Sequence, residues 1–312
     1  MPPVVIVNLI LIGIFLVYII GPAAVGFYST FSRFKCESFD TKDITGTVFE
    51  KYKDLYVDLI PKIKAMPHER VTVKSEEGFD LAADFFDNGS CDTVIFVHGF
   101  SSNKYSNFAK QCDDLKDRVN FLMVEQRAHN DSGGKWVTFG IKEQYDLLKW
   151  AEWAAKRKPG KIFIYGVSMG AATAGFASDK LDPSRVAGII MESGFKSPFT
   201  MLYDSSVGKY TIVKILTPFM AMFARIFIGI DMRQRVSDGL SKTTIPVLFI
   251  HGTKDVKVPI SHSCYNSEVC SSDNRKLFIE GGQHAVTYIY GADRTKAAVR
   301  SFIDNGFGDG AF

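Results

Sequence analysis

The sequence predicts an α/β fold in which helices cover both faces of a mostly parallel central sheet. Short, continuous apolar runs recur along the chain, and segments with helical periodicity lie between them. Continuous apolar runs are typical of parallel strands, which are buried on both faces. Their alternation with helices implies βαβ units with right-handed crossovers. A chain of 312 residues with 46% hydrophobic content is long enough for one such domain with added segments.

Charge and cysteine content exclude several classes of protein. Lysine and arginine number 37 against 34 acidic residues, and no basic cluster carries interleaved aromatics, so nucleic acid is not an expected partner. An odd, irregularly spaced set of cysteines fits a reducing compartment, although a Cys264–Cys270 pair is possible. No cysteine has zinc-site neighbours, and neither a metal nor a cofactor is expected. The cysteines are Cys36, Cys91, Cys112, Cys264 and Cys270.

The first 32 residues contain no charged side chain, and Val4 to Val25 are almost wholly apolar. As a helix this stretch would reach about 33 Å, enough to cross a hydrocarbon core of roughly 30 Å. A cleaved signal peptide is the first alternative, but its positive amino-terminal region is missing and the run is too long. A buried core helix is the second, but it should have a polar face. Residues 1–32 are therefore predicted to form a single transmembrane anchor.

Basic residues follow the span and none precedes it. Arg33, Lys35 and Lys42 come after the apolar run, so the positive-inside rule places the following domain in the cytoplasm. Residues 33–69 are expected to be a connecting segment. If the span only tethers, a chain that starts near Arg33 should be soluble and active.

The main domain, residues 70–312, is expected to begin with a hairpin. Alternating apolar residues in 71–73 and 81–85 flank the turn signal Glu77-Gly78. Apolar runs that are expected to form further strands occupy residues 93–99, 119–124, 161–166, 185–193, 246–252 and 275–281.

One segment between these runs has clear helical periodicity, and another interrupts the alternation of strands and helices. Residues 139–158 keep a 3.6-residue period until Pro159-Gly160 stops it. Residues 195–244 break the alternation, and 210–230 are richer in Ile, Phe and Met than a surface crossover needs. We interpret 195–244 as a helical cap over the carboxyl edge of the sheet, where ligands of α/β proteins bind. An ordinary pair of buried crossover helices is the alternative.

A serine lies where one predicted strand meets a helix. Residues 166–170 fit the pattern G-x-S-x-G, with an apolar strand before them and the helix-forming run MGAATAGFA after Val167-Ser168. Glycines are needed there because side chains would collide with the strained turn that exposes a nucleophile. The context makes Ser168 a candidate nucleophile.

A serine hydroxyl needs a base and an orienting carboxylate, in the chain order Ser, Asp or Glu, His. Asp255 follows the strand that ends near residue 252, and His284 follows the strand that ends near residue 281. Asp255 would hold the imidazole tautomer, and His284 would take the Ser168 proton and return it to the leaving group.

Two backbone amides are expected to form an oxyanion hole. One belongs to Met169, directly after the nucleophile, and the other to Phe100, in the loop after the strand 93–99. His98 and His251, each in a His-Gly pair, are interpreted mainly as structural residues. Glu192 and Glu280 are rival carboxylates, but neither lies in the His-Gly-x-x-Asp loop, which favours Asp255.

These features resemble the α/β-hydrolase superfamily. The resemblance covers roughly residues 71–304, and it is closest to bacterial membrane-anchored hydrolases related to the esterase, acylglycerol-lipase and serine-aminopeptidase branch. The block from Arg127 to Gly134 is similar to a family loop that lines the site, which implies substrate-side or structural roles for Arg127 and His129. His98 is a further candidate for lining the substrate site. Asn130 stands where the family commonly has glycine. The motifs are VHGF (97–100), EQRAHNDSGGKWVTFGIKEQYD (125–146), YGVSMGAAT (165–173), ESGF (192–195), IPVLFIHGTKDVKVP (245–259) and EGGQHA (280–285).

The resemblance implies an α/β-hydrolase fold and hydrolysis through an acyl-enzyme without a cofactor. The expected function is a membrane-anchored serine hydrolase that cleaves carboxylic esters, with apolar acyl esters as one option. The expected partners are a small-molecule ester or acyl substrate and the membrane. Amide hydrolysis of the serine-aminopeptidase kind, or thioester hydrolysis, is the alternative on the same residues. A non-catalytic binding module is the alternative from another class.

Overall fold

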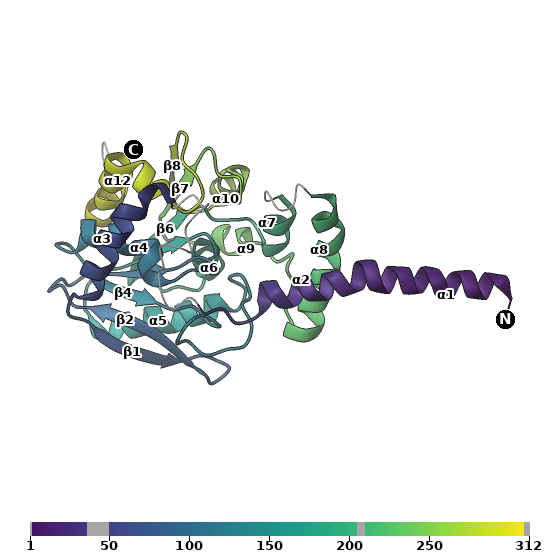
Figure 1. Ribbon diagram of the computed structural model, residues 1–312. Coiled ribbons are helices and arrows are strands. Elements are labelled where there is room, and N and C mark those ends of the chain that lie inside the picture. The colour runs from purple at the N-terminus through teal and green to yellow at the C-terminus, as the bar shows by residue number, and fades with distance from the viewer. Residues whose placement is uncertain (1, 36–49, 205–209, 309–312) are drawn as a thin grey trace.

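The protein is described by a computed structural model that covers residues 2–35, 50–204 and 210–308 (Figure 1). In this part of the chain, eight strands form one sheet in the order β1-β2-β4-β3-β5-β6-β7-β8. Strand β2 is antiparallel to both of its neighbours, and all the other neighbours are parallel. The strands are β1 (Glu69–Lys74), β2 (Asp80–Phe86), β3 (Thr93–Val97), β4 (Asn120–Val124), β5 (Ile162–Val167), β6 (Val186–Glu192), β7 (Val247–Gly252) and β8 (Asn274–Ile279).

Helices connect these strands and cover the sheet. Within the described residues they are α1 (Pro3–Phe15), α2 (Gly21–Phe31), α3 (Lys53–Lys64), α4 (Lys104–Leu115), α5 (Glu143–Arg157), α6 (Met169–Ala177), α7 (Pro198–Asp204), α8 (Thr211–Phe223), α9 (Ser237–Leu240), α10 (Ser261–Val269), α11 (Thr287–Tyr290) and α12 (Ala292–Asn305). A wider helical turn joins α1 to α2 over Leu16–Ile20, and another extends α8 over Ala224–Ile228. The predicted α/β fold is confirmed.

Two hydrophobic cores lie on opposite faces of the sheet. Ile95 and Val97 of β3 face a core that includes α5 and α6, whereas Val94 and Phe96 face a core that includes α4 and α12. Successive side chains of a strand point to opposite faces, so a strand that is buried on both sides must be apolar throughout. This requirement explains the continuous apolar runs of the sequence.

The N-terminal helix has two different halves. Residues Pro3–Phe31 form one helical stretch of 29 residues that is long and apolar enough to cross a membrane. Helix α1 has no buried residue and projects from the domain (Figure 1). In α2, by contrast, Ala23, Phe27 and Phe31 are buried. The final turns of the helix therefore belong to the hydrophobic core of the domain.

The segment after the N-terminal helix contains a further helix, where the sequence predicted only a connecting segment. Helix α3 buries Tyr56, Leu59, Ile60 and Ile63 and packs beside α4. Residues 36–49, with Cys36 and Lys42, lie outside the described residues. Cys264 and Cys270 are free thiols, so the pair that the sequence allowed is not formed.

The expected insertion contains α7, α8 and α9. Helix α8 packs across α2, and α9 packs against α6. Helix α8 and its extension form a second stretch, Thr211–Ile228, that is long and apolar enough to cross a membrane, with 28% of it buried. The role of this segment as a cap above Ser168 stays a prediction.

Candidate active site

The turn between β5 and α6 presents Ser168 at the carboxyl edge of the sheet. Ser168 adopts φ 54° and ψ −109°, a strained conformation that non-glycine residues rarely take. A Cβ atom on Gly170 would lie 1.8 Å from the Val97 carbonyl oxygen, and one on Gly166 would lie 2.3 Å from the Gly170 carbonyl oxygen. The two glycines are required because backbone segments meet there without room for a side chain.

The structure brings the three predicted residues together. The hydroxyl of Ser168 lies 3.0 Å from Nε2 of His284, and Nδ1 of His284 lies 2.7 Å from Oδ2 of Asp255. Each residue follows a different strand, β5, β7 or β8, and the carboxyl ends of these parallel strands meet at one edge. The arrangement has the chemical elements of a nucleophile, a base and an orienting carboxylate.

Asp255 is held by more than its contact with His284. Its Oδ1 accepts the backbone N–H groups of Lys257 and Val258 at 3.0 and 2.8 Å. Nε2 of His251 lies 3.3 Å from its Oδ2. Burial opposes the charged form, but His284 and His251 outweigh that effect, so the pKa of Asp255 is below its ordinary value. The carboxylate is therefore ionised near neutral pH.

His251 lies beside Asp255 and supports its loop, which is a structural role of the kind that the sequence indicated for this histidine. Its Nδ1 contacts the hydroxyl of Ser263 at 2.6 Å, and its Nε2 contacts the Val258 carbonyl oxygen at 2.9 Å. These contacts fix the ring against the loop that carries Asp255. The signal was present in the sequence, because His251 and Asp255 are four residues apart around a Gly.

The two predicted oxyanion donors have unoccupied amides. In the described part of the chain, neither the Phe100 N–H nor the Met169 N–H donates a hydrogen bond to another protein group. The Cβ position of Gly99 would lie 3.4 Å from Cβ of Ser168, so the loop after β3 runs directly beside the nucleophile. Asn107 accepts the Gly99 N–H at 2.7 Å and fixes this loop to α4.

The rival carboxylates occupy other positions. Glu192 is buried behind the site, where it accepts bonds from the Tyr165 hydroxyl at 2.8 Å and the Tyr288 N–H at 3.2 Å. Burial raises its pKa. Glu280 is exposed at the end of β8. The His284 contact therefore belongs to Asp255.

His98, Arg127 and His129 are almost fully buried, with 0, 3 and 0% exposure. The ring of His98 contacts the Gly99 carbonyl oxygen at 2.7 Å and accepts the Gln126 N–H at 3.1 Å. Arg127 forms a two-bond ion pair with Asp146 at 2.6 and 2.7 Å. These contacts favour the structural alternative over substrate lining for His98 and Arg127.

The N-terminal segment supports the loop that carries Phe100. The Phe100 ring lies 4.9 Å from that of Phe139, which lies 5.3 Å from that of Phe31. Phe34 donates its N–H to the Ala128 carbonyl at 2.7 Å, and Arg33 donates to the carbonyl of Ser132 at 2.6 Å. The end of the N-terminal helix is thereby joined to the site.

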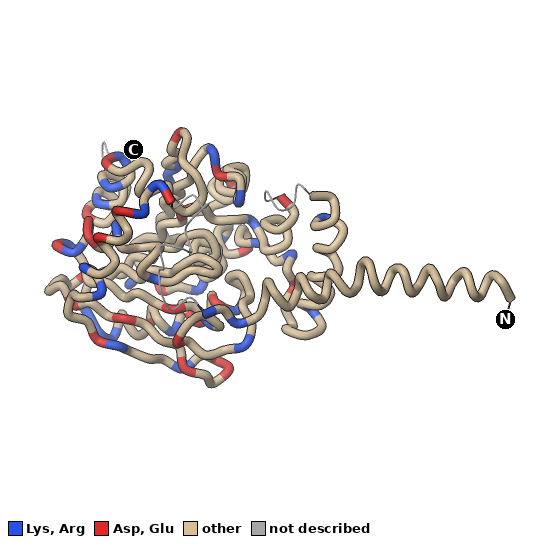
Figure 2. Tube along the Cα trace, in the orientation of Figure 1, with Lys and Arg blue, Asp and Glu red and all other residues tan. Residues whose placement is uncertain are grey.

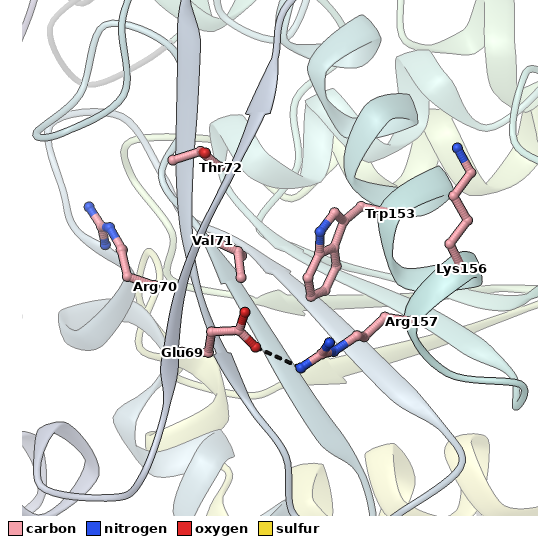
Figure 3. A pocket seen from close by; sticks show the side chains of 7 residues that line it. All are labelled: Glu69, Arg70, Val71, Thr72, Trp153, Lys156 and Arg157. Carbon is pink, nitrogen blue, oxygen red and sulfur yellow. Dashed lines mark hydrogen bonds and ion pairs between the residues drawn. The ribbon is translucent and has the colours of Figure 1, made fainter.

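A shallow surface hollow of about 520 Å³ is lined by none of Ser168, Asp255 and His284. It is formed by β1 and the end of α5, and its main polar feature is the Glu69–Arg157 ion pair at 2.6 Å (Figure 3). Strand β1 is the first in the order of the sheet, four strands away from β5 and further from β7 and β8, which the three residues follow. It has no catalytic constellation.

Comparisons with known proteins agree with the fold. Residues 92–226 match the model of a family described as alpha/beta hydrolase fold. An esterase of Pyrococcus furiosus, Pf2001, superimposes with a TM-score of 0.63 at 22% identity, over 78% of this chain and 92% of the esterase. The chain therefore has the α/β-hydrolase fold.

Two curated relatives match most of the length of this chain. The protein YqkD of Bacillus subtilis is 25% identical over 275 residues, which are 86% of this chain and 89% of the relative. YNL320W of Saccharomyces cerevisiae, described as a membrane protein, is 26% identical over 256 residues, which are 79% of this chain and 84% of the relative. The similarity to both therefore extends well beyond residues 92–226.

Proposed function

We propose that the protein is a membrane-anchored serine hydrolase that cleaves carboxylic esters through an acyl-enzyme. One observation carries the proposal: the continuous contact from Ser168 through His284 to Asp255, at 3.0 and 2.7 Å. The likeness to the Pf2001 esterase supports ester chemistry, and the description of the yeast relative as a membrane protein supports the anchor.

The proposed reaction begins with attack by the Ser168 hydroxyl oxygen on the ester carbonyl carbon. His284 Nε2 takes the hydroxyl proton, and Asp255 stabilises the imidazolium through Nδ1. The carbonyl oxygen becomes negative and accepts hydrogen bonds from the Phe100 and Met169 amides. The bond to the alcohol then breaks, and His284 gives its proton to the leaving oxygen.

Water completes the proposed cycle by the same route. His284 removes a proton from water, the resulting hydroxide attacks the acyl carbon, and the bond to Ser168 breaks. The serine oxygen recovers its proton from His284, and the acid product leaves. Each step uses side chains and backbone amides of this chain.

The anchor in this proposal is the helical stretch Pro3–Phe31, with the hydrolase domain on the cytoplasmic side. Arg33 and Lys35 directly follow the stretch, which favours this orientation. Reagents that modify lysines but do not cross membranes should leave the domain unmodified in sealed cells. Modification in sealed cells would reverse the orientation.

A fluorophosphonate probe tests the catalytic assignment. It should label the wild type at Ser168, and Ser168→Ala or His284→Ala should lower turnover by about a million-fold. Ser178→Ala, at a buried serine beyond the other end of α6, is the control and should keep labelling. Labelling that persists in Ser168→Ala would contradict the assignment.

A substrate panel tests the ester assignment. Short esters, long-chain esters and aminoacyl amides should be compared at equal enzyme concentration in detergent. We expect the esters to be cleaved fastest. Faster cleavage of the amides would replace the ester proposal with amide hydrolysis on the same three residues.

A further inference from the structure

The exposed side of α8 and its extension carries a row of apolar side chains. Ile212, Ile215, Met222 and Ile226 are 48, 44, 42 and 64% exposed, and Pro218 lies between them. Their spacings of three and four residues place them in one stripe along the helix. We call this stripe, together with Phe227 at 63% exposure, the outer face of α8.

The opposite side of the same helix is also apolar. Met220, Ala221, Ala224 and Ile228 are buried against α2 and the domain. A surface helix normally turns its polar side to water, whereas a contiguous exposed apolar patch marks a contact site for protein or lipid. Protein covers only one side of α8 in the described structure.

The two nearby cations, Lys214 and Arg225, contact other side chains of the protein. Nζ of Lys214 lies over the ring of Tyr203 in α7, at 5.0 Å from its centroid. The guanidinium of Arg225 lies 3.6 Å from the carboxylate of Asp231. Figure 2 shows the projecting helix without charge and only isolated charges on α8. Both cations could reach lipid headgroups while the stripe contacts acyl chains.

The outer face continues the surface of the N-terminal helix. The rings of Phe15 and Phe219 meet at 5.7 Å, and those of Phe27 and Phe223 at 5.9 Å. Figure 1 shows α8 running across the axis of the N-terminal helix, at the end of the domain from which α1 projects. If α1 enters a bilayer along its axis, α8 lies along the plane of that bilayer.

The contact with α8 lies within the exposed apolar stretch of the N-terminal helix. Phe15, whose ring meets that of Phe219, is followed by Leu16, Val17 and Tyr18, which are 51, 65 and 67% exposed. A bilayer that covers these side chains reaches the level of α8. Interfacial helices sink about 5–10 Å into the boundary between headgroups and acyl chains, and α8 would lie in that zone.

We propose that the outer face of α8 is a membrane-contacting surface, immersed in the acyl-chain boundary of one leaflet beside the N-terminal helix. The occupant of this face is a lipid bilayer. The inference rests on the proposed anchor and is independent of the proposed ester hydrolysis. In this proposal, both the N-terminal helix and the outer face of α8 contact the membrane.

Photolabelling of the full chain tests this surface. The protein is reconstituted in phosphatidylcholine vesicles that contain a lipid with a diazirine on its acyl chain, irradiated and mapped by mass spectrometry. We expect labels on α1 and on Ile215, Met222, Ile226 and Phe227. Val57 and Val256, at 50 and 57% exposure on other elements, are matched controls and should stay unlabelled.

Each other outcome overturns the proposal. Labels on α1 without labels on α8 would leave the anchor in place and exclude α8 from the bilayer. Labels on neither would exclude both membrane contacts. Cross-links between two copies through an unlabelled α8 would assign the outer face to a second copy of the chain.

A tryptophan pair gives a second readout of depth. Ile226→Trp and Val256→Trp place the same fluorophore on α8 and on the loop after β7. Lipids brominated on the acyl chain should quench the added emission of Ile226→Trp and leave that of Val256→Trp unchanged. Equal quenching of the two variants would contradict the immersion of α8.

Discussion

The change Phe31→Ala tests whether the N-terminal helix is part of the folded domain or only a tether. Phe31 is 0% exposed, and its ring lies 5.2 Å from that of Phe27 and 5.3 Å from that of Phe139. Its carbonyl oxygen accepts the Val137 N–H at 2.8 Å. Replacement by alanine keeps this backbone bond and removes the ring.

The expected loss of stability follows from the burial of the ring. Truncation of a fully buried phenylalanine to alanine costs about 3–5 kcal/mol, because apolar burial is lost and a cavity remains. Domains are stable by only about 5–15 kcal/mol, so the variant loses a large part of its stability. With about 2–4 °C per kcal/mol for a large domain, the midpoint of thermal unfolding should fall by at least about 6 °C.

The measurement is thermal and urea unfolding of full-length variants in one detergent. Tyr28→Ala is the matched control, because Tyr28 lies one turn away in α2 and is 63% exposed. We expect a large shift for Phe31→Ala and a small one for Tyr28→Ala. Equal shifts would refute the reasoning. A chain that starts at Arg33 lacks this ring altogether and should be less stable than one that starts at Gly21.

Two further predictions concern histidines that the structure places near the site. His251→Gln removes the imidazole that lies beside Asp255. Because hydrogen bonds to charged groups contribute about 1.5–3 kcal/mol, kcat/KM should fall about tenfold to a hundredfold. A loss as large as that of Ser168→Ala would instead assign His251 a direct role in the reaction. Burial, together with the nearby His129, lowers the pKa of His98 from the ordinary 6.5 to about 3. Below pH 6.5 the unfolded chain therefore binds a proton that the folded protein does not, and the free energy of unfolding falls as the pH drops. Between pH 7 and 5, urea unfolding should show a loss about 2 kcal/mol smaller in His98→Gln than in the wild type, and equal losses would contradict a neutral His98.

The residues around Ser168 could be predicted from the sequence because of a geometric rule. Parallel strands end at the same edge of a sheet, so Ser168, Asp255 and His284 had to meet if each followed such a strand. The strands themselves were visible because burial on both faces leaves no polar position. Distances between side chains, and the order of the strands in the sheet, required the structure.

The packing of the N-terminal helix could not be predicted in the same way. Ala23, Phe27 and Phe31 are spaced by four residues and form one buried side. A buried side of a helix is normally predicted from the polar residues on its other side, and this stretch has no charged residue there. The sequence therefore predicted an apolar helix long enough to span a membrane, but not that one side of this helix packs against the domain.

Helix α3 was hidden for a different reason. Tyr56, Leu59, Ile60 and Ile63 have helical spacing, but Pro61 stands among them. Proline inside a helix removes a hydrogen bond and usually ends the helix at the preceding residue. Here tertiary packing against α4 outweighs that cost, and the helix continues to Lys64.

The proposed membrane contact and the proposed catalytic site are parts of one packed unit. The ring of Phe27 contacts those of Phe223, at the end of α8, and Phe31. The ring of Phe31 contacts that of Phe139, which contacts Phe100 in the loop beside Ser168. A site on a flexible tether would sample many heights above a bilayer. Because these rings contact one another at 4.9–5.9 Å, we expect the proposed membrane contact to hold the carboxyl edge of the sheet in one orientation toward the bilayer.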